Sequence, residues 1–292
     1  MVRWHNGTIE YFDEHQVMNW HPAKFFTDRE LKTPYALLLL NQSLNEPAYK
    51  RIVCRASMIT CGDGGANQLY DIIQQLQDDP LRRFPDAIVG DLDSLKDHVR
   101  DFFQDAGRTQ IVRVPDQDST DFTKALRWLK QHGTRNSDDR VDVVVFGGLG
   151  GRVDQGFSIV HHLFKAVSDE ELLTGDIYLL SEQSLSFVLE KGRNVIHGLA
   201  PGANHIFQES VGIIPIRGPA VISTKGLEWD VEDWKTELGG QLSTSNHIKA
   251  DVVEIEASDR MLFTIELANV LCTKSHQNEE NEKAQAWIGI ST

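Results

Sequence analysis

Between residue 34 and about residue 180, short apolar runs of strand length alternate with polar turns and with helical stretches. Six runs are predicted to be strands: residues 35–41, 57–61, 86–89, 109–114, 141–146 and 176–180. Apolar positions at helical spacing predict helices over residues 67–77, 96–103, 122–131 and 153–167. Strands that alternate with helices usually pair in parallel and are covered on both faces. This part is therefore predicted to be a three-layer α/β domain with a parallel sheet.

After about residue 189 the pattern changes to short β-like stretches separated by Gly, Pro and Asn. These stretches cover residues 194–197, 212–216, 220–223, 251–256 and 262–266. They predict a smaller antiparallel β-sandwich domain. The expected organisation is an N-terminal extension (1–33), an α/β domain (34–189), the β-sandwich domain (190–274) and a polar tail (275–292).

Composition limits the classes of partner. The formal net charge of −14, from 29 basic and 43 acidic residues, argues against nucleic acid or an anionic membrane as a partner. The three cysteines form no metal-binding pattern, which favours a reducing compartment. We expect no signal peptide, and the longest apolar run, residues 36–40, is too short to span a bilayer. We expect a soluble, cytoplasmic protein.

Four polar clusters directly follow predicted strands, at residues 62–67, 90–94, 116–121 and 147–155. Because the carboxyl ends of parallel strands meet at one edge of a sheet, these clusters should converge there. The resulting carboxylates would repel one another unless a cation neutralised them. Oxygen ligands without cysteine favour magnesium over zinc. The sequence therefore predicts a magnesium site at this edge.

Each cluster also has a structural interpretation. Asp93 and Ser94, or Thr120 and Asp121, would serve equally as caps of the helices that follow them. The glycine-rich stretch 147–151 fits no standard nucleotide motif and is either a tight turn or an anion-binding loop, with Arg152 as a phosphate contact. Lys124 would reach a phosphate or pair with Asp121.

In the predicted β domain, one tryptophan lies among hydroxyl and amide groups. Trp229 in Thr224–Val231, together with residues 242–246, would suit a flat cationic ring. A tryptophan is nonetheless more often a core residue, so both interpretations stay open.

Seven strings occur in order between about residue 57 and residue 267: DGGANxLYD (63–71), PDxIxGDLDSL (85–95), DQDSTDFTK (116–124), GGLGGRVDQ (147–155), EQSL (182–185), GLEWD (226–230) and STSN (243–246). Together they resemble the thiamine pyrophosphokinase family. The resemblance implies that ATP and thiamine give AMP and thiamine diphosphate, by attack of the thiamine hydroxyl on the β-phosphorus. It also implies Mg²⁺ and a homodimer whose active sites lie at the subunit interface.

Residue roles follow from the same resemblance. It implies a metal site of Asp63, Asp91, Asp93 and Asp121, with Gln117 also in the catalytic set. It implies ATP contacts from Asp63, Asn67, Thr120, Lys124 and Arg152, and thiamine contacts from Asp154, Gln155, Trp229, Ser243, Ser245 and Asn246. Two other functions remain compatible with the sequence: a kinase for another small alcohol, and a thiamine-binding sensor without catalysis.

Overall fold

The computed structural model describes residues 2–5, 8–11, 17–27, 33–76, 79, 81–133, 140–172, 175–200 and 206–272. The predicted polar tail 275–292 lies outside this part of the chain. The described residues divide into two compact units, which we name the α/β unit (Phe25–Ser186 with the segment that begins at Leu267) and the β unit (Met1–Lys24 with Phe187–Glu266). Within the described residues, no helix has the length and apolar character needed to cross a membrane.

The α/β unit contains a parallel sheet in the order β9-β8-β4-β5-β6-β7. Its strands are β4 (Tyr35–Leu39), β5 (Met58–Gly62), β6 (Ala87–Gly90), β7 (Gln110–Arg113), β8 (Asp142–Phe146) and β9 (Ile177–Leu180). β10 (Ser184–Leu189) begins in this unit, where it pairs antiparallel with β9, and ends in the β unit. The predicted parallel sheet is confirmed.

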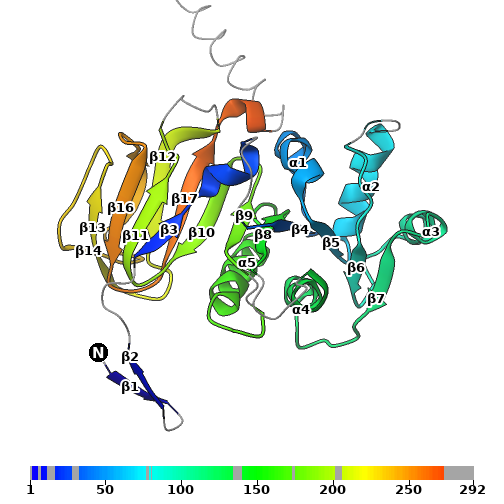
Figure 1. Cartoon of the computed structure of the whole chain (residues 1–292), viewed down its shortest axis with the longest axis horizontal. Coiled ribbons are helices and arrows are strands. Elements are labelled where there is room, and N and C mark those ends of the chain that lie inside the picture. The colour runs from blue at the N-terminus through cyan, green and yellow to red at the C-terminus, as the bar shows by residue number, and fades with distance from the viewer. Residues whose placement is uncertain are drawn as a thin grey trace, which may run out of the picture. The chain divides into compact units, whose positions relative to one another are not determined.

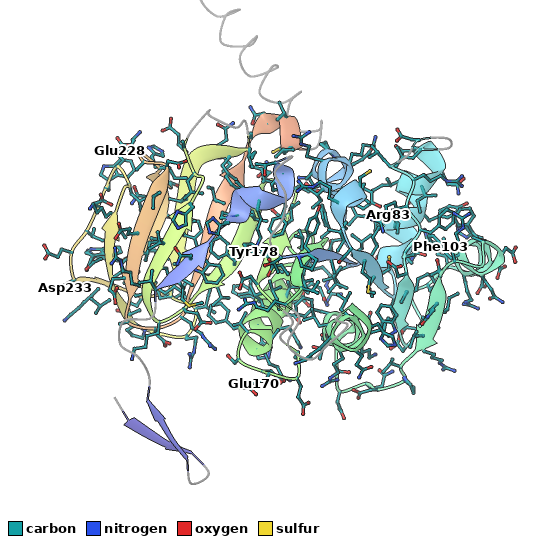
Figure 2. All side chains as sticks on the ribbon, viewed as in Figure 1. Arg83, Phe103, Glu170, Tyr178, Glu228 and Asp233 are labelled. Carbon is teal, nitrogen blue, oxygen red and sulfur yellow. The ribbon has the colours of Figure 1, made fainter. Side chains whose placement is uncertain are left out.

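Helices cover both faces of this sheet. They are α1 (Glu46–Ile52), α2 (Gly65–Gln75), α3 (Asp97–Asp105), α4 (Asp121–Gly133) and α5 (Val153–Ala166), with short η2 (Val53–Arg55) and η3 (Asn269–Leu271). α1 and α2 lie on one side of the strands, and α4 and α5 on the other (Figure 1). Tyr178 of β9 is completely buried and lies deep among packed side chains, whereas Glu170 lies at the periphery (Figure 2). The predicted three-layer arrangement is therefore present.

The β unit contains two groups of hydrogen-bonded strands. One has the order β15-β12-β17-β10, with β12 (Phe207–Ile214), β15 (Ser243–His247) and β17 (Met261–Leu267). The other has the order β14-β13-β16-β11-β3, with β3 (Met18–Trp20), β11 (Gly192–His197), β13 (Ala220–Lys225), β14 (Trp234–Thr236) and β16 (Val252–Ala257). The Trp20 and Phe187 rings, from β3 and β10, lie 4.8 Å apart and join the two sheets.

Part of the predicted N-terminal extension belongs to this β unit. β3 pairs in parallel with β11, and the Trp20 indole N–H donates to Asn194 Oδ1 over 3.0 Å. The prediction that residues 1–33 lie outside the domains is wrong for this segment, because three residues are too few to show a strand period. A hairpin of β1 (Val2–His5) and β2 (Thr8–Tyr11) precedes it, and η1 (Pro22–Phe26) follows it.

Candidate active site

The first acidic residue of the site, Asp63, directly follows β5 in the chain. Asp63 is fully buried and has a backbone φ of +27°, which lies in the left-handed region. Its Oδ2 accepts a hydrogen bond from the Ser94 N–H over 3.0 Å, whereas its buried Oδ1 has no partner among the described residues. Burial raises the pKa of Asp63 to about 6, and the charges of Asp121 and Asp91 act in the same direction. A buried carboxylate oxygen without a partner is costly, so this atom is suited to bind a cation.

The loop after β6 brings two further carboxylates to the same place. Asp91 Oδ1 accepts from the Asp93 N–H over 3.3 Å, and Asp91 Oδ2 accepts from Gln117 Nε2 over 3.3 Å. The Asp93 N–H holds the pKa of Asp91 below its usual range, so this carboxylate is ionised at neutral pH. Asp63, Asp91 and Asp93 each offer an oxygen, and these oxygens lie within 4.8 Å of one another. The structure thus brings together three of the four predicted metal ligands.

The fourth predicted ligand, Asp121, begins α4 beside this cluster. Its Oδ1 lies 3.7 Å from Lys124 Nζ, and the same ammonium lies 4.0 Å from Asp91 Oδ2. Burial raises the pKa of Asp121, while Lys124 acts against this increase. The Lys124 side chain is only 2% exposed. In this structure Lys124 is therefore a buried counter-ion between two carboxylates.

A glycine allows these acids to approach one another. A Cβ at Gly90 would lie 2.7 Å from Asp63 Cβ and 3.0 Å from Asp121 Oδ1. Any side chain at this last position of β6 would separate the two carboxylates or displace them. The glycine before Asp91 is thus needed for the cluster itself.

Asn67 supports the acidic loop through both of its polar side-chain atoms. Its Nδ2 donates to the Ser94 carbonyl over 2.8 Å, and its Oδ1 accepts from the Lys96 N–H over 3.1 Å. The resemblance implies a contact from Asn67 to ATP, and in the structure both polar atoms of this side chain bind the backbone of the acidic loop. Among the described residues no side chain caps α3, whose N-cap is Lys96, so the capping interpretation of Asp93 and Ser94 has no support.

The other predicted substrate contacts of the α/β unit either cap a helix or are exposed at the surface. Thr120 Oγ1 accepts from the Thr123 N–H over 3.4 Å and so caps α4, as one interpretation of the sequence expected. Gln117 is exposed beside Asp91. Arg152 and Asp154 are both exposed and form a two-point ion pair with distances of 3.1 and 2.6 Å, which holds the pKa of Asp154 below its usual range. Gln155 is exposed next to this pair.

The sequence missed two polar residues at the same edge of the sheet. Asn41 and Gln42 follow β4, whose carboxyl end lies between those of β5 and β8. The sequence pattern does not single them out, because Asn41 lies at the end of the predicted strand 35–41 and neither residue is charged. The sequence feature that distinguishes them is a run of apolar residues that ends in two residues with carboxamide side chains.

The predicted thiamine contacts belong to the β unit. Trp229 is 54% exposed, which favours the ligand-platform interpretation over the core interpretation. Figure 2 shows the neighbouring Glu228 at the periphery of this unit. Asn246 is buried; its Oδ1 accepts from the Trp229 N–H over 3.2 Å and its Nδ2 donates to the Trp229 carbonyl over 3.0 Å. Asn246 therefore holds the backbone of the tryptophan.

Further contacts stabilise this loop, and the sequence singled out none of them. The Asp230 carboxylate accepts from Thr224 Oγ1 and from the Gly226 and Leu227 N–H groups over 2.9–3.1 Å. The His247 ring lies 5.1 Å from the Trp229 ring, and His247 Nδ1 contacts Glu228 Oε2 over 2.6 Å. Ser243 is half-buried, and Ser245 is exposed with a φ of +55°.

The fold and this site define a class of protein. A parallel sheet whose carboxyl edge carries clustered carboxylates, beside two glycine-rich loops that lead into helices, suits an enzyme that transfers a phosphate-containing group from a metal-bound nucleotide.

Comparisons with known proteins define the family within this class. The family model described as the catalytic domain of thiamin pyrophosphokinase matches residues 49–174, and the one described as its vitamin B1 binding domain matches residues 197–262. The chain belongs to the thiamine pyrophosphokinase family.

Individual relatives agree with this assignment. Thiamine pyrophosphokinase 2 of Arabidopsis thaliana is 32% identical over 260 residues, which cover 85% of this chain and 92% of the relative. Thiamine pyrophosphokinase 1 of the same plant is 34% identical over 250 residues, covering 80% and 87%. The structure of thiamin pyrophosphokinase from Candida albicans aligns with a TM-score of 0.75 at 24% identity, covering 86% of this chain and 93% of that one. The resemblance found in the sequence is confirmed.

Proposed function

We propose that the carboxylate edge of the α/β unit is the catalytic centre of a thiamine diphosphokinase. This enzyme transfers a diphosphate group from ATP to the hydroxyl of thiamine and releases AMP, the reaction that membership of the family carries with it. The observation that supports the site most directly is the unpartnered, buried Asp63 Oδ1 beside Asp91 and Asp93. Phosphoryl-type transfer requires positioning and charge neutralisation more than a protein nucleophile, and this site offers carboxylates accordingly.

The donor atoms fit a magnesium ion. Asp63, Asp91 and Asp93 supply only carboxylate oxygens, which are the ligands Mg²⁺ prefers, and Asp121 lies beside them. When bound, the ion would neutralise the phosphate oxygens of ATP and polarise the phosphorus under attack. The protein's own contribution is to hold ionised acids close together. The Asp93 N–H and the Lys124 ammonium stabilise the negative charge of Asp91.

The pKa of Asp63 makes metal binding dependent on pH. Because its pKa rises from 3.8 to about 6 on folding, the folded metal-free protein binds this proton more tightly than the unfolded chain does. The contribution of Asp63 to the free energy of unfolding is therefore full below the unfolded pKa and is lost as pH rises through about 6. Above this pH the ionised carboxylate is free to bind Mg²⁺, and binding should compensate for the lost contribution to the free energy of unfolding.

Thermal unfolding tests this dependence. The rise in Tm caused by Mg²⁺ should be several-fold larger at about pH 7.5 than at about pH 5. The Asp63→Asn variant removes the titrating charge with little change in volume, so it should have a flatter pH dependence and a much smaller Mg²⁺ effect. Equal Mg²⁺ effects at both pH values in the unaltered protein, or an unchanged effect in the variant, would contradict the assignment of Asp63.

The nucleotide phosphates are proposed to contact Gln117, Thr120, Lys124 and Arg152. Thr120 and Lys124 lie in or just before the first turn of α4, where backbone N–H groups and the helix dipole favour an anion. Arg152 stands at the N-terminus of α5 and is already placed in a bidentate ion pair that a phosphate would imitate. Asn67 is proposed to act through the loop that it supports.

Thiamine is proposed to bind against Trp229, with Ser243 and Ser245 as polar contacts and Asn246 as the support of the tryptophan. The thiazolium ring carries a permanent positive charge, which an exposed indole face attracts. Asp154 and Gln155, at the start of α5, are proposed to face thiamine from the α/β unit.

We infer that the enzyme is a homodimer in which each active site combines the α/β unit of one chain with the β unit of its partner. Two apolar side chains of α5, Val153 and Phe157, are 73% and 67% exposed, although their spacing continues the apolar stripe of the helix. Such exposed apolar positions next to the glycine-rich loop suit contact with a second subunit. The mass of a single chain in solution at assay concentrations would contradict this arrangement.

Product analysis tests the function. Incubation with ATP, Mg²⁺ and thiamine should yield AMP and thiamine diphosphate in equal amounts, separated by chromatography. ADP with thiamine monophosphate would instead indicate ordinary phosphoryl transfer, and no consumption of ATP would indicate a sensor without catalysis.

A further inference from the structure

Asn41 and Gln42 occupy a special place in the sheet. From β4 the chain proceeds to β5, β6 and β7 on one side, and then returns to β8 and β9 on the other side of β4. The strand order therefore reverses between β4 and β8. Ligands of open α/β sheets bind in the crevice outside the carboxyl ends of the strands at such a reversal. The loops that border it are residues 41–43 after β4 and 147–151 after β8.

Glycines on both sides leave room for these two side chains. A Cβ at Gly64 would lie 2.4 Å from both Cγ and Nδ2 of Asn41, and a Cβ at Gly151 would lie 2.5 Å from Gln42 Oε1. A Cβ at Gly147 would lie 2.9 Å from the backbone carbonyl oxygen of Gln42. Real Cβ atoms do not approach other heavy atoms this closely, so Gly64 and Gly151 leave room for the two carboxamides, and Gly147 leaves room for the backbone of Gln42.

Their polar atoms are available to a ligand. Asn41 is exposed and Gln42 is half-buried. Within the described part of the chain, neither side-chain amide has a hydrogen-bond partner, and the only hydrogen bond of this turn runs from the Gln42 N–H to the Leu40 carbonyl over 2.9 Å. Well-placed carboxamides without partners at a ligand-binding crevice are suited to ligand recognition.

We propose that Asn41 and Gln42 bind the phosphate chain of the nucleotide, an assignment that rests on the proposed function. The two side chains lie next to Gly64, which precedes α2, and Gly151, which precedes Arg152 and α5. Helix N-termini favour anions, and carboxamide N–H groups donate to phosphate oxygens without adding negative charge to an already acidic edge. The carboxylates would then hold the cation while the carboxamides hold the anion.

Separate substitutions test the contacts. Asn41→Ala and Gln42→Ala should each raise the KM for ATP by about tenfold or more, which is the usual cost of losing a hydrogen bond to a charged group, and leave the KM for thiamine within about twofold. Gln42→Glu should weaken ATP binding further because its charge repels phosphate. Gln104→Glu, the same change at an exposed position of α3, is the matched control and should have no effect.

A double substitution tests the geometry. Gly64 has φ −62° and ψ −15°, so alanine is compatible with its backbone, and the three atoms nearest to an added Cβ all belong to the Asn41 side chain. Gly64→Ala should therefore raise the KM for ATP by displacing Asn41, but should cost nothing further when Asn41 is already alanine. Additive effects of the two changes would overturn the proposal, provided that thermal unfolding shows every variant to be folded.

Direct binding separates this inference from the proposed function. Calorimetry with Mg²⁺ and α,β-methylene-ATP measures nucleotide affinity without turnover. Weaker binding by the Asn41 and Gln42 variants supports the inference even if the unaltered protein makes no thiamine diphosphate. Normal binding by both variants, in a protein that does make thiamine diphosphate, overturns the inference and leaves the function standing.

Discussion

Replacement of Asp91 by asparagine is expected to lower kcat by about a hundredfold, which corresponds to roughly 3 kcal/mol of lost transition-state stabilisation. Asparagine preserves the volume and retains an oxygen that accepts from the Asp93 N–H, so the loop should keep its shape. The substitution removes the negative charge of Asp91, a carboxylate that is ionised because the surrounding hydrogen-bond donors lower its pKa. The loss should therefore appear in turnover, because a weakly held or misplaced cation no longer neutralises the migrating diphosphate.

Steady-state rates at saturating ATP and thiamine measure this effect. Asp101→Asn, at an exposed position of α3, makes the same chemical change away from the cluster and should leave kcat unchanged. A higher Mg²⁺ concentration should restore part of the activity of the Asp91 variant. A near-normal kcat for Asp91→Asn at ordinary Mg²⁺ concentrations would remove Asp91 from the metal site.

The convergence of the acidic loops was predictable from the sequence, and the reason is geometric. Regular alternation of strands and helices implies a parallel sheet, and a parallel sheet brings all loops that follow its strands to one edge. Asp63, Asp91 and Asp93, from the loops after β5 and β6, therefore meet although up to 30 positions separate them in the chain. No side-chain detail was needed for this inference.

The partners of individual polar groups were not predictable in the same way. Asn67 and Asn246 were both expected to contact substrates, yet each uses its donor and acceptor on the backbone of a neighbouring loop. An exposed ligand-binding amide and a buried loop-supporting amide have the same sequence signature, because the distinction depends on which loop packs behind the residue. Tertiary contacts alone decide it.

Short elements were also missed where the local signal was too brief. α1 has seven residues, too few to show an apolar stripe, although Asn45 caps it by accepting from the Ala48 N–H over 3.0 Å. β14 has three residues, and β15 consists of polar residues without strand alternation. Pairing with longer neighbours, rather than intrinsic preference, makes these segments strands.

Replacement of Trp229 by alanine is expected to raise the KM for thiamine by about ten- to thirtyfold, and to change the KM for ATP by less than about twofold. The indole is exposed in this structure and so contributes little to the core, which means that its loss should not unfold the β unit. Stacking and cation–π attraction with the thiazolium ring account for the size of the effect. Leu238→Ala, which removes another side chain of the β unit that is 54% exposed, is the control. Equal increases in both KM values, or an insoluble variant, would favour a structural role.

Mixing subunits extends this prediction to the proposed dimer. If each active site combines the α/β unit of one chain with the β unit of the other, a heterodimer of an Asp91→Asn chain and a Trp229→Ala chain contains one doubly altered site and one unaltered site. Random exchange of equal amounts should then restore about a quarter of the unaltered activity at low thiamine, where both parent variants are poor. A mixture that stays at the average of its two parents would show that each site is built from a single chain. Trp229 and Asp91 of the same subunit would then contribute to the same active site.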